Sequence, residues 1–261
     1  MPISPKRMPF FGHIEELRRR LFVIVAVLTV FCIGFYFLSD QIYAILIAPV
    51  KSVIGENAAF TFDVLEGMMN RFKLGLWAGL LAASPVIIYE VLAFFLPALK
   101  PKERRWFVST FVAAVALFAS GVAFCYFFIL EPSSAWLVAQ NGETFSLMLR
   151  ASSFLQFEMW FLAGFGIAFE VPVAVFYLVY FEVVPYAKLR KNWRTVWVVI
   201  VVVASAITPD WSPISMGALS AVMIVLFEGS MLLVRGMLRK KIAADEADED
   251  DDDDSDDASA E

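Results

Sequence analysis

Residues 13–38 read HIEELRRRLFVIVAVLTVFCIGFYFL, so a short charged segment runs without a break into a long apolar one. The apolar part is long enough to cross the ~30 Å hydrocarbon core of a bilayer, for which a helix needs about 20 residues. Within the charged part, Glu15 precedes Arg19 and Glu16 precedes Arg20 by four residues, the favourable orientation for ion pairs on a helix. The stretch therefore predicts a membrane helix that begins with charged residues.

Apolar residues dominate the rest of the chain as well. Of its 261 residues 60% are hydrophobic, and the mean hydropathy is +0.70, more than an ordinary soluble domain carries. The sequence therefore predicts an all-α membrane protein. Six apolar windows are expected to cross the membrane, at residues 21–39, 72–96, 107–130, 154–181, 195–208 and 213–234.

The last two spans are expected to be short and to form a hairpin around the TPDWSP turn at residues 208–213. The fifth window has few residues. In the sixth, Pro213 and Gly217 weaken the first helical turns.

Lysines and arginines indicate which side of the membrane each connection faces. Of the 21, 17 lie at the N-terminus or after the second, fourth and sixth windows, and 4 lie in the other connections. Because short cytoplasmic connections carry the excess of positive charge, both termini are expected in the cytoplasm. We expect a multi-pass protein of the plasma (inner) membrane. The outer connections, about residues 40–70 and 131–153, mix apolar and polar residues and predict short amphipathic helices.

The carboxyl-terminal end has a different composition. From Asp245 onward lie 12 of the 27 acidic residues and no basic one, so the rest of the chain carries 21 − 15 = +6. Such a run of like charge repels itself and is expected to be disordered. Three segments are therefore predicted: a cytoplasmic amphipathic N-terminus at 1–20, a six-span domain at 21–235, and a cytoplasmic basic-then-acidic tail at 236–261.

Residue types that carry metal or nucleophilic chemistry are scarce. Cys32 and Cys125 fall in different apolar windows and are expected to be small core residues. With one histidine and no C-x-x-C, a structural zinc site is not expected. The sequence also lacks G-x-S-x-G, H-E-x-x-H and P-loop motifs. We expect no metal, no cofactor, no nucleic-acid partner and no enzymatic activity.

Carboxylates inside apolar windows are informative, because a charge at mid-bilayer costs ~2.5 kcal/mol or more. Glu170 lies about 24 Å along the fourth window, and Pro172 predicts a kink beside it. Glu170 is either a polar station in a cavity, which we favour, or a protonated group that bonds a neighbouring helix. Glu158 is expected to be interfacial. Glu90 is expected to pair with an arginine of the following loop.

Two further glutamates lie among cytoplasmic cations. Glu103 belongs to KPKERRW (100–106), and Glu16 belongs to the charged start quoted above. From the residues alone, a surface ion pair worth under ~1 kcal/mol is the favoured interpretation of Glu103. The same interpretation applies to Glu16, although orientation would need only its arginine neighbours.

Several motifs, in order, resemble a known family. FGHIEELRRRL (11–21) resembles the amino-terminal signature H-L-x-E-L-R-x-R-L of the TatC family, the multi-span receptor subunit of the twin-arginine protein translocase. The other similar segments are SPVIIYEVLAFFLPALKPKERR (84–105), FGIAFEVPV (165–173), ITPDWSP (207–213) and LFEG (226–229). The likeness extends over about residues 11–235 and leaves out the acidic tail.

The resemblance implies a glove-shaped bundle of six transmembrane helices with both termini in the cytoplasm. It implies a receptor for the paired-arginine signal peptide of folded cargo proteins. Its partners would be TatA- and TatB-type single-span proteins, further copies of itself within the receptor complex, and the lipid bilayer. Transport would be driven by the proton motive force.

The resemblance also implies roles for particular residues. Glu16 and Glu103 would accept the signal arginines, and Leu17 and Arg18 would shape the same patch. Glu170 would be the polar residue of the membrane-facing concavity. Positions that match structural or partner-contact sites of the family are Pro49, Phe62, Pro85, Thr208 and Asp210.

The sequence departs from the family's pattern at three places. The family's Tyr-Gln-x-Trp reads YEVL at residues 89–92, so Glu90 stands where the family has glutamine. Pro-Gly-Leu reads PAL at residues 97–99. In the last outer turn a gapless match places Ser212 at the family's aspartate, with Asp210 two residues earlier.

Two other classes of function are alternatives for a chain of this composition. A proton-coupled small-molecule transporter would use Glu170 as a proton relay. An intramembrane enzyme would need a nucleophile and a base inside a span, and the only histidine, His13, lies outside one. The receptor interpretation is favoured, because a guanidinium binds carboxylates in a bidentate geometry and two adjacent arginines need at least two carboxylates.

Overall fold

The computed structural model describes most of the chain between its two ends. The described stretches are residues 10–54, 59–95, 105–140, 149–181, 183–208 and 212–237. Within them, five helical stretches are long and apolar enough to cross a membrane, and a further apolar helix, α10 (Trp193–Ile207), has 15 residues. The predicted all-α membrane fold is confirmed at this level, and the count of six spans stays a prediction.

Contacts divide the chain into two compact units. The first contains Met1–Ala119 and Asn141–Met159, and the second contains Ser120–Gln140 and Trp160–Glu261. The division passes through two long helices, α5 (Arg105–Phe124) and α7 (Ala151–Ala168), each of which contributes residues to both units.

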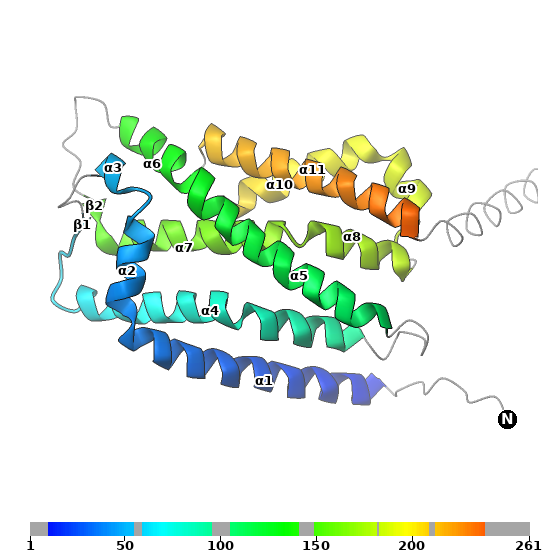
Figure 1. Ribbon diagram of the computed structural model, residues 1–261, viewed down its shortest axis with the longest axis horizontal. Helices are drawn as coiled ribbons and strands as arrows, with labels where there is room; N and C mark the ends of the chain where they lie inside the picture. Colours follow the sequence, from blue (N-terminus) through cyan, green and yellow to red (C-terminus); the bar gives the residue numbers. More distant parts are fainter. Residues whose placement is uncertain are drawn as a thin grey trace, which may run out of the picture. The chain divides into compact units, whose positions relative to one another are not determined.

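The first unit is built on a pair of antiparallel helices, α1 (Phe10–Phe37) and α4 (Glu66–Phe95), which lie side by side (Figure 1). Helix α4 meets α1 at Gly75 and Gly79, one turn apart. A Cβ atom at Gly75 would lie 2.9 Å from the backbone oxygen of Cys32, and one at Gly79 would lie 3.0 Å from its backbone nitrogen. Only glycine allows two helix backbones to approach this closely. The two glycines form a G-x-x-x-G pattern in the sequence.

Enlarging Gly79 is expected to separate these two helices. A Gly79→Leu side chain would overlap the α1 backbone, and overpacking of this kind costs about 1–3 kcal/mol. We expect the midpoint of thermal unfolding in detergent to fall by about 4–8 °C. Gly34→Leu is the matched control, because a Cβ at Gly34 meets nothing within 4 Å. Equal effects of the two substitutions would contradict the close helix contact.

Short elements connect α1 to α4, as predicted for residues 40–70. They are α2 (Ser39–Ile47), α3 (Lys51–Ile54) and β1 (Ala59–Phe60). Strand β1 pairs in parallel with β2 (Leu149–Arg150), which joins the segment before α4 to the segment before α7. The carboxylate of Glu66 accepts hydrogen bonds from Arg150 Nε at 2.9 Å and from the backbone nitrogen of Phe62 at 2.8 Å. This hydrogen bond raises the pKa of Arg150 above its ordinary value.

Two features shape the spans of the second unit. Helix α5 continues through a π-helical segment, η2 (Cys125–Ile129), into α6 (Leu130–Ala139). Helix α7 ends at Ala168, and α8 (Val171–Tyr180) begins after a break with Pro172 in its first turn. Proline fits a first helical turn because that turn needs no N–H donor. The predicted break beside Glu170 is therefore confirmed.

The last helices of the second unit are α9 (Tyr186–Lys191), α10 and α11 (Pro213–Met237), and α11 packs on α10 and α8. The 15 residues of α10 extend only about 22 Å, as predicted, but α11 has 25 residues and extends about 38 Å. The expectation of a short sixth span was wrong.

The start of α11 explains this difference. Pro213 is the first residue of the helix, where its missing N–H costs no hydrogen bond. Ser212 caps the helix, because its Oγ accepts a hydrogen bond from the backbone nitrogen of Ser215 at 3.0 Å. The Ser215 hydroxyl in turn donates to Ser133 of α6 at 2.9 Å, which fixes this end of α11 inside the unit.

Candidate functional site

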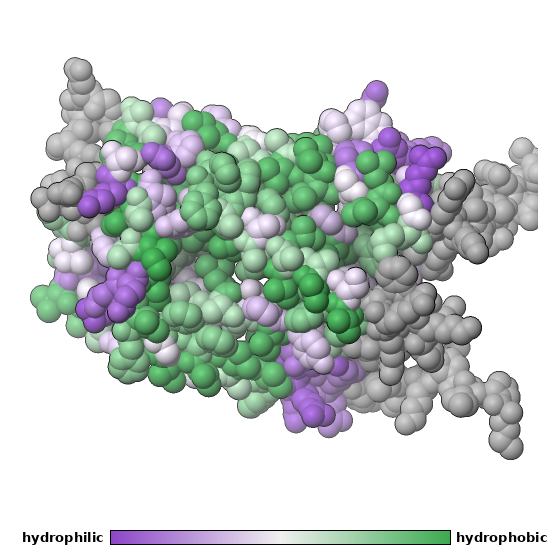
Figure 2. Space-filling view, viewed as in Figure 1, coloured by the Kyte–Doolittle hydropathy of each residue, from purple (hydrophilic) through white to green (hydrophobic). Residues whose placement is uncertain are grey.

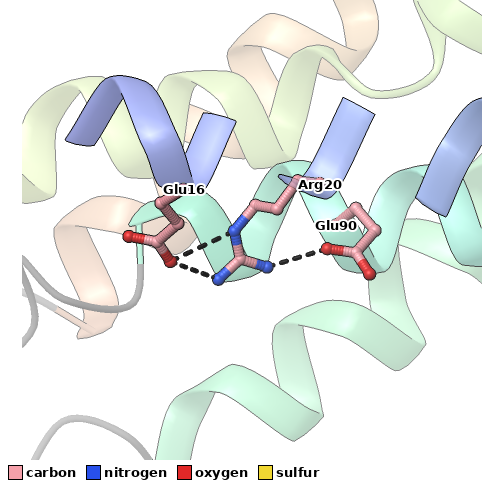
Figure 3. Close-up of polar contacts among 3 residues, drawn as sticks. All are labelled: Glu16, Arg20 and Glu90. Atoms are coloured by element: carbon pink, nitrogen blue, oxygen red, sulfur yellow. Dashed lines mark hydrogen bonds and ion pairs between the residues drawn. The ribbon is translucent and has the colours of Figure 1, made fainter. Parts of the chain in front are cut away.

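The charged start of α1 packs against the far end of α4 through three ionised side chains (Figure 3). Arg20 lies between two carboxylates. Its Nη2 and Nε atoms donate to Oε1 of Glu16 at 2.5 and 3.2 Å, and its Nη1 donates to Oε2 of Glu90 at 2.8 Å. The predicted Glu16–Arg20 ion pair is confirmed. The partner of Glu90 is this α1 arginine, whereas the sequence suggested an arginine of the loop after α4.

The packing of α1 against α4 brings together Arg20 and Glu90, which are 70 positions apart in the sequence. Glu16 and Arg20 are one helical turn apart and share a face of α1. Glu90 reaches them because α4 runs antiparallel to α1 and the glycine contacts keep the two helices close. The side chains of Arg20, Glu16 and Glu90 are 21%, 20% and 13% exposed. Partial burial excludes much of the water that weakens ion pairs at a surface.

The three groups together carry a net charge of −1, because two carboxylates share one guanidinium. The second oxygen of Glu16, Oε2, is buried, and no donor among the described residues bonds to it. A carboxylate can accept hydrogen bonds at both oxygens. Within the described residues, Arg20 therefore uses only one oxygen of each carboxylate.

Leu17 and Arg18 lie beside this cluster on the surface of α1. Leu17 is 52% exposed, and Arg18 is exposed as well. Figure 2 shows a hydrophilic patch where α1 begins, and apolar side chains along the rest of the helix. The exposed charged residues at this end of α1 are Glu15, Arg18 and Arg19.

Two of the predicted site residues, Glu103 and Asp210, lie outside the described residues, as does nearly all of the predicted tail.

The carboxylate predicted to be a polar station, Glu170, stands in the break between α7 and α8. It is the residue immediately before α8, and its backbone oxygen accepts a hydrogen bond from the nitrogen of Ala174 at 2.9 Å. The side chain is partly buried, and its Oε1, a buried atom, has no hydrogen-bond partner among the described residues.

Glu158 was expected to be interfacial, and this expectation was wrong. Its side chain is completely buried, and neither of its carboxyl oxygens has a hydrogen-bond partner among the described residues. The neighbouring residues on the same helix that are also buried are Phe154, Leu155, Met159, Phe161 and Leu162. The sequence position of Glu158 did not predict its exposure, because the face of α7 on which it lies is covered by other parts of the protein.

Removing the buried carboxyl group of Glu158 is expected to stabilise the protein. Burying a polar group without a hydrogen-bond partner costs about 1–3 kcal/mol, which Glu158→Met would recover. We expect the thermal unfolding midpoint in detergent to rise, while Gln156→Met, at an exposed position of the same helix, leaves it nearly unchanged. A lower midpoint for Glu158→Met would show that the carboxyl group has a stabilising partner.

The residues carried over as structural or partner-contact positions have different environments. Pro49 is partly buried in the turn between α2 and α3, and Pro85 lies inside α4. The side chain of Phe62 is 59% exposed. Thr208 is buried at the end of α10, and its hydroxyl donates to the backbone oxygen of Ala204 at 3.1 Å.

A further carboxylate, Glu228, has partners on the two helices that precede its own. Glu228 of α11 accepts hydrogen bonds from Arg190 of α9 at 2.9 Å and from the indole of Trp197 in α10 at 3.3 Å. In the described part of the chain, no three His, Cys, Asp or Glu side chains are grouped in a way that could hold a metal ion.

Comparison with known proteins identifies the family to which this arrangement belongs. The family model described as "Sec-independent protein translocase protein (TatC)" matches residues 12–221, which include the charged cluster, Glu170 and Thr208. The chain belongs to the TatC family. The resemblance found in the sequence motifs is thereby confirmed.

TatC proteins from distant organisms align with most of this chain. The TatC of Carboxydothermus hydrogenoformans is 28% identical over 243 residues, which cover 93% of this chain and 99% of that protein. The TatC of Escherichia coli K12 is 34% identical over 222 residues, covering 84% and 85%. The chloroplastic TATC of Pisum sativum is 29% identical over 231 residues, covering 88% and 65%.

A solved structure supports the same assignment. The crystal structure of the twin arginine translocase receptor TatC superposes with a TM-score of 0.73 at 25% identity, and the match covers 85% of this chain and 98% of that one. As a TatC-family member the chain is a multi-pass membrane component of the Sec-independent translocase, which works with other Tat subunits. The family's role is transport, without enzymatic activity.

Proposed function

We propose that this TatC-family chain is the receptor subunit that binds the paired arginines of a signal peptide on folded cargo. Binding takes place at the cytoplasmic end of α1, and Glu16 and Glu103 accept the two guanidinium groups. With TatA- and TatB-type partners the chain then exports the cargo by using the proton motive force. Both termini lie in the cytoplasm, as the distribution of lysine and arginine indicates.

One observation carries this proposal. The carboxylate of Glu16 already binds a guanidinium, that of Arg20, through two N–H groups, and its second oxygen has no partner among the described residues. A carboxylate in this environment suits an arginine ligand better than a lysine, because the guanidinium offers paired donors in a fixed plane. The exposed side chain of Leu17 provides an apolar contact beside it for the rest of a signal peptide.

Cross-linking tests the proposal directly. A photoreactive residue is placed at position 17, which leaves the Glu16 carboxylate intact, and membranes are exposed to a signal peptide with Arg-Arg or Lys-Lys. We expect strong cross-links to the Arg-Arg peptide and weak ones to the Lys-Lys peptide. Position 30 of the same helix serves as the control, because Val30 is exposed on the apolar part of α1. Equal labelling of both peptides at position 17 would refute the receptor function.

A further inference from the structure

The cluster at the start of α1 is a guanidinium bound between two carboxylates, and the protein itself supplies all three groups (Figure 3). We propose that Glu16 and Glu90 form one arginine-binding site, which Arg20 occupies in the resting protein and which a signal-peptide arginine occupies after displacing Arg20. Glu90 is then a specificity-determining residue, and Arg20 is a built-in competitor. This inference rests on the proposed receptor function and names a residue and an exchange step within it.

The geometry of Arg20 matches that of a bound ligand. Three of its guanidinium nitrogens donate, two to Glu16 and one to Glu90, so the group is held from two sides by different helices. A side chain that served only to pair with its own helix would need Glu16 alone. The second carboxylate, brought from α4, completes a site that fits a planar cation with several N–H donors.

The charge balance leaves the site ready for exchange. Two carboxylates and one guanidinium leave a net charge of −1, which attracts a second cation. An incoming arginine can therefore replace Arg20 on the same carboxylates, one contact at a time, as Arg20 moves out. The two carboxylates are not left unpaired at any stage, which avoids the high cost of a partly buried charge without a partner.

The identity of residue 90 gives this site its second charge. The motif that the sequence resembles has glutamine at this position, and this chain has Glu90. A carboxamide presents both an N–H₂ donor and an oxygen acceptor, whereas a carboxylate presents acceptors only. Glutamate therefore binds any guanidinium more strongly here, both that of Arg20 and that of a ligand.

If this exchange takes place, replacing Arg20 and replacing Glu90 should change the affinity for the signal peptide in opposite directions. Without the Arg20 guanidinium the ligand meets no competitor, so Arg20→Gln should strengthen binding. Without the Glu90 carboxylate the net charge of the cluster rises from −1 to 0, because Arg20 then neutralises Glu16, so Glu90→Gln should weaken the binding of a cationic ligand. A purely structural ion pair predicts that both substitutions weaken binding, because both break the same contact.

Anisotropy of a fluorescent Arg-Arg signal peptide, measured with the purified full-length protein in lipid nanodiscs, tests this inference. We expect the dissociation constant to fall about tenfold for Arg20→Gln and to rise about fivefold for Glu90→Gln, as the gain or loss of one charged hydrogen bond implies. The double variant lacks both the competitor and the second carboxylate, so its dissociation constant should lie between those of the two single variants. The control is Glu15→Gln, an exposed glutamate on the same helix, which should have no effect.

Two outcomes overturn the inference. It is wrong if Arg20→Gln folds, as its thermal unfolding shows, and binds the peptide no better than the unmodified protein does. If Arg20→Gln fails to fold, Arg20→Lys replaces it, because lysine keeps the charge but competes with fewer fixed donors. Binding by Arg20→Lys that is no tighter than that of the unmodified protein then overturns the exchange.

The same experiment separates this inference from the proposed function. The unmodified protein is also measured with a Lys-Lys peptide. No preference for Arg-Arg refutes the receptor function itself. A clear preference that is unaffected by residues 20 and 90 leaves the receptor function standing and refutes only the exchange.

Discussion

Export of a twin-arginine cargo is expected to fall at least a hundredfold when Glu16 and Glu103 are both replaced by glutamine. Each substitution removes a charge-assisted contact to a signal arginine, and such contacts are worth about 1.5–3 kcal/mol each. Two losses of this size correspond to a factor of about 10² to 10⁴ in binding. The measurement is the rate of cargo export in cells or membrane vesicles that contain the TatA- and TatB-type partners.

Single variants and a charge-matched control sharpen this result. Glu16→Gln and Glu103→Gln are each expected to reduce export about tenfold or more, because each leaves one signal arginine with its own carboxylate. Glu15→Gln changes the same charge on an exposed neighbour of Glu16 and should leave export within about twofold of the unmodified protein. Normal export by the double variant, at an equal amount of protein in the membrane, would rule out these two residues as the signal-binding carboxylates.

Replacing Glu170 by leucine is expected to reduce export about tenfold or more. The side chain stands at the break between α7 and α8, and its Oε1 has no partner within the described structure. A polar group left in this position at a cost of ~2.5 kcal/mol or more is expected to have a role in transport. Leucine removes every hydrogen-bonding atom of the side chain, whereas Glu170→Gln keeps an oxygen acceptor and most of the shape.

The glutamine variant distinguishes two functions. If Glu170 is a polar station for a protein translocase, Glu170→Gln should retain at least half of the export activity. If it is the proton relay of a small-molecule transporter, glutamine should abolish transport, because a carboxamide does not carry a proton at neutral pH. Substrate uptake by liposomes that contain this chain alone, lost in Glu170→Gln, would favour the transporter.

The helical spans were predictable because their causes are local. A run of about 20 apolar residues has its lowest free energy in a bilayer as a helix that spans it. The break before Pro172 follows from the missing N–H of proline. The length of α11 was misjudged because Pro213 was treated as a weak point. Its actual role depends on its place in the helix, at the first position, with Ser212 as the cap.

The candidate site was predictable in part. Glu16 was found through its motif and its spacing from Arg20. The pairing of Arg20 with Glu90 was not found, since no local rule joins residues 70 positions apart. One signal was present in the sequence: a glutamate at a family glutamine position is an added charge that needs a partner. The two close glycines of α4 gave a second signal, because G-x-x-x-G predicts a tight contact with a neighbouring helix.

The sequence by itself determined which segments are apolar, which connections carry positive charge and to which family the motifs are similar. These properties depend on composition and on short-range order along the chain. Only the tertiary structure decided that Glu158 is buried and that Arg20 is held between Glu16 and Glu90. Burial and ion pairing depend on which faces of different helices meet. At α1 and α4 that meeting is governed by backbone contact at Gly75 and Gly79.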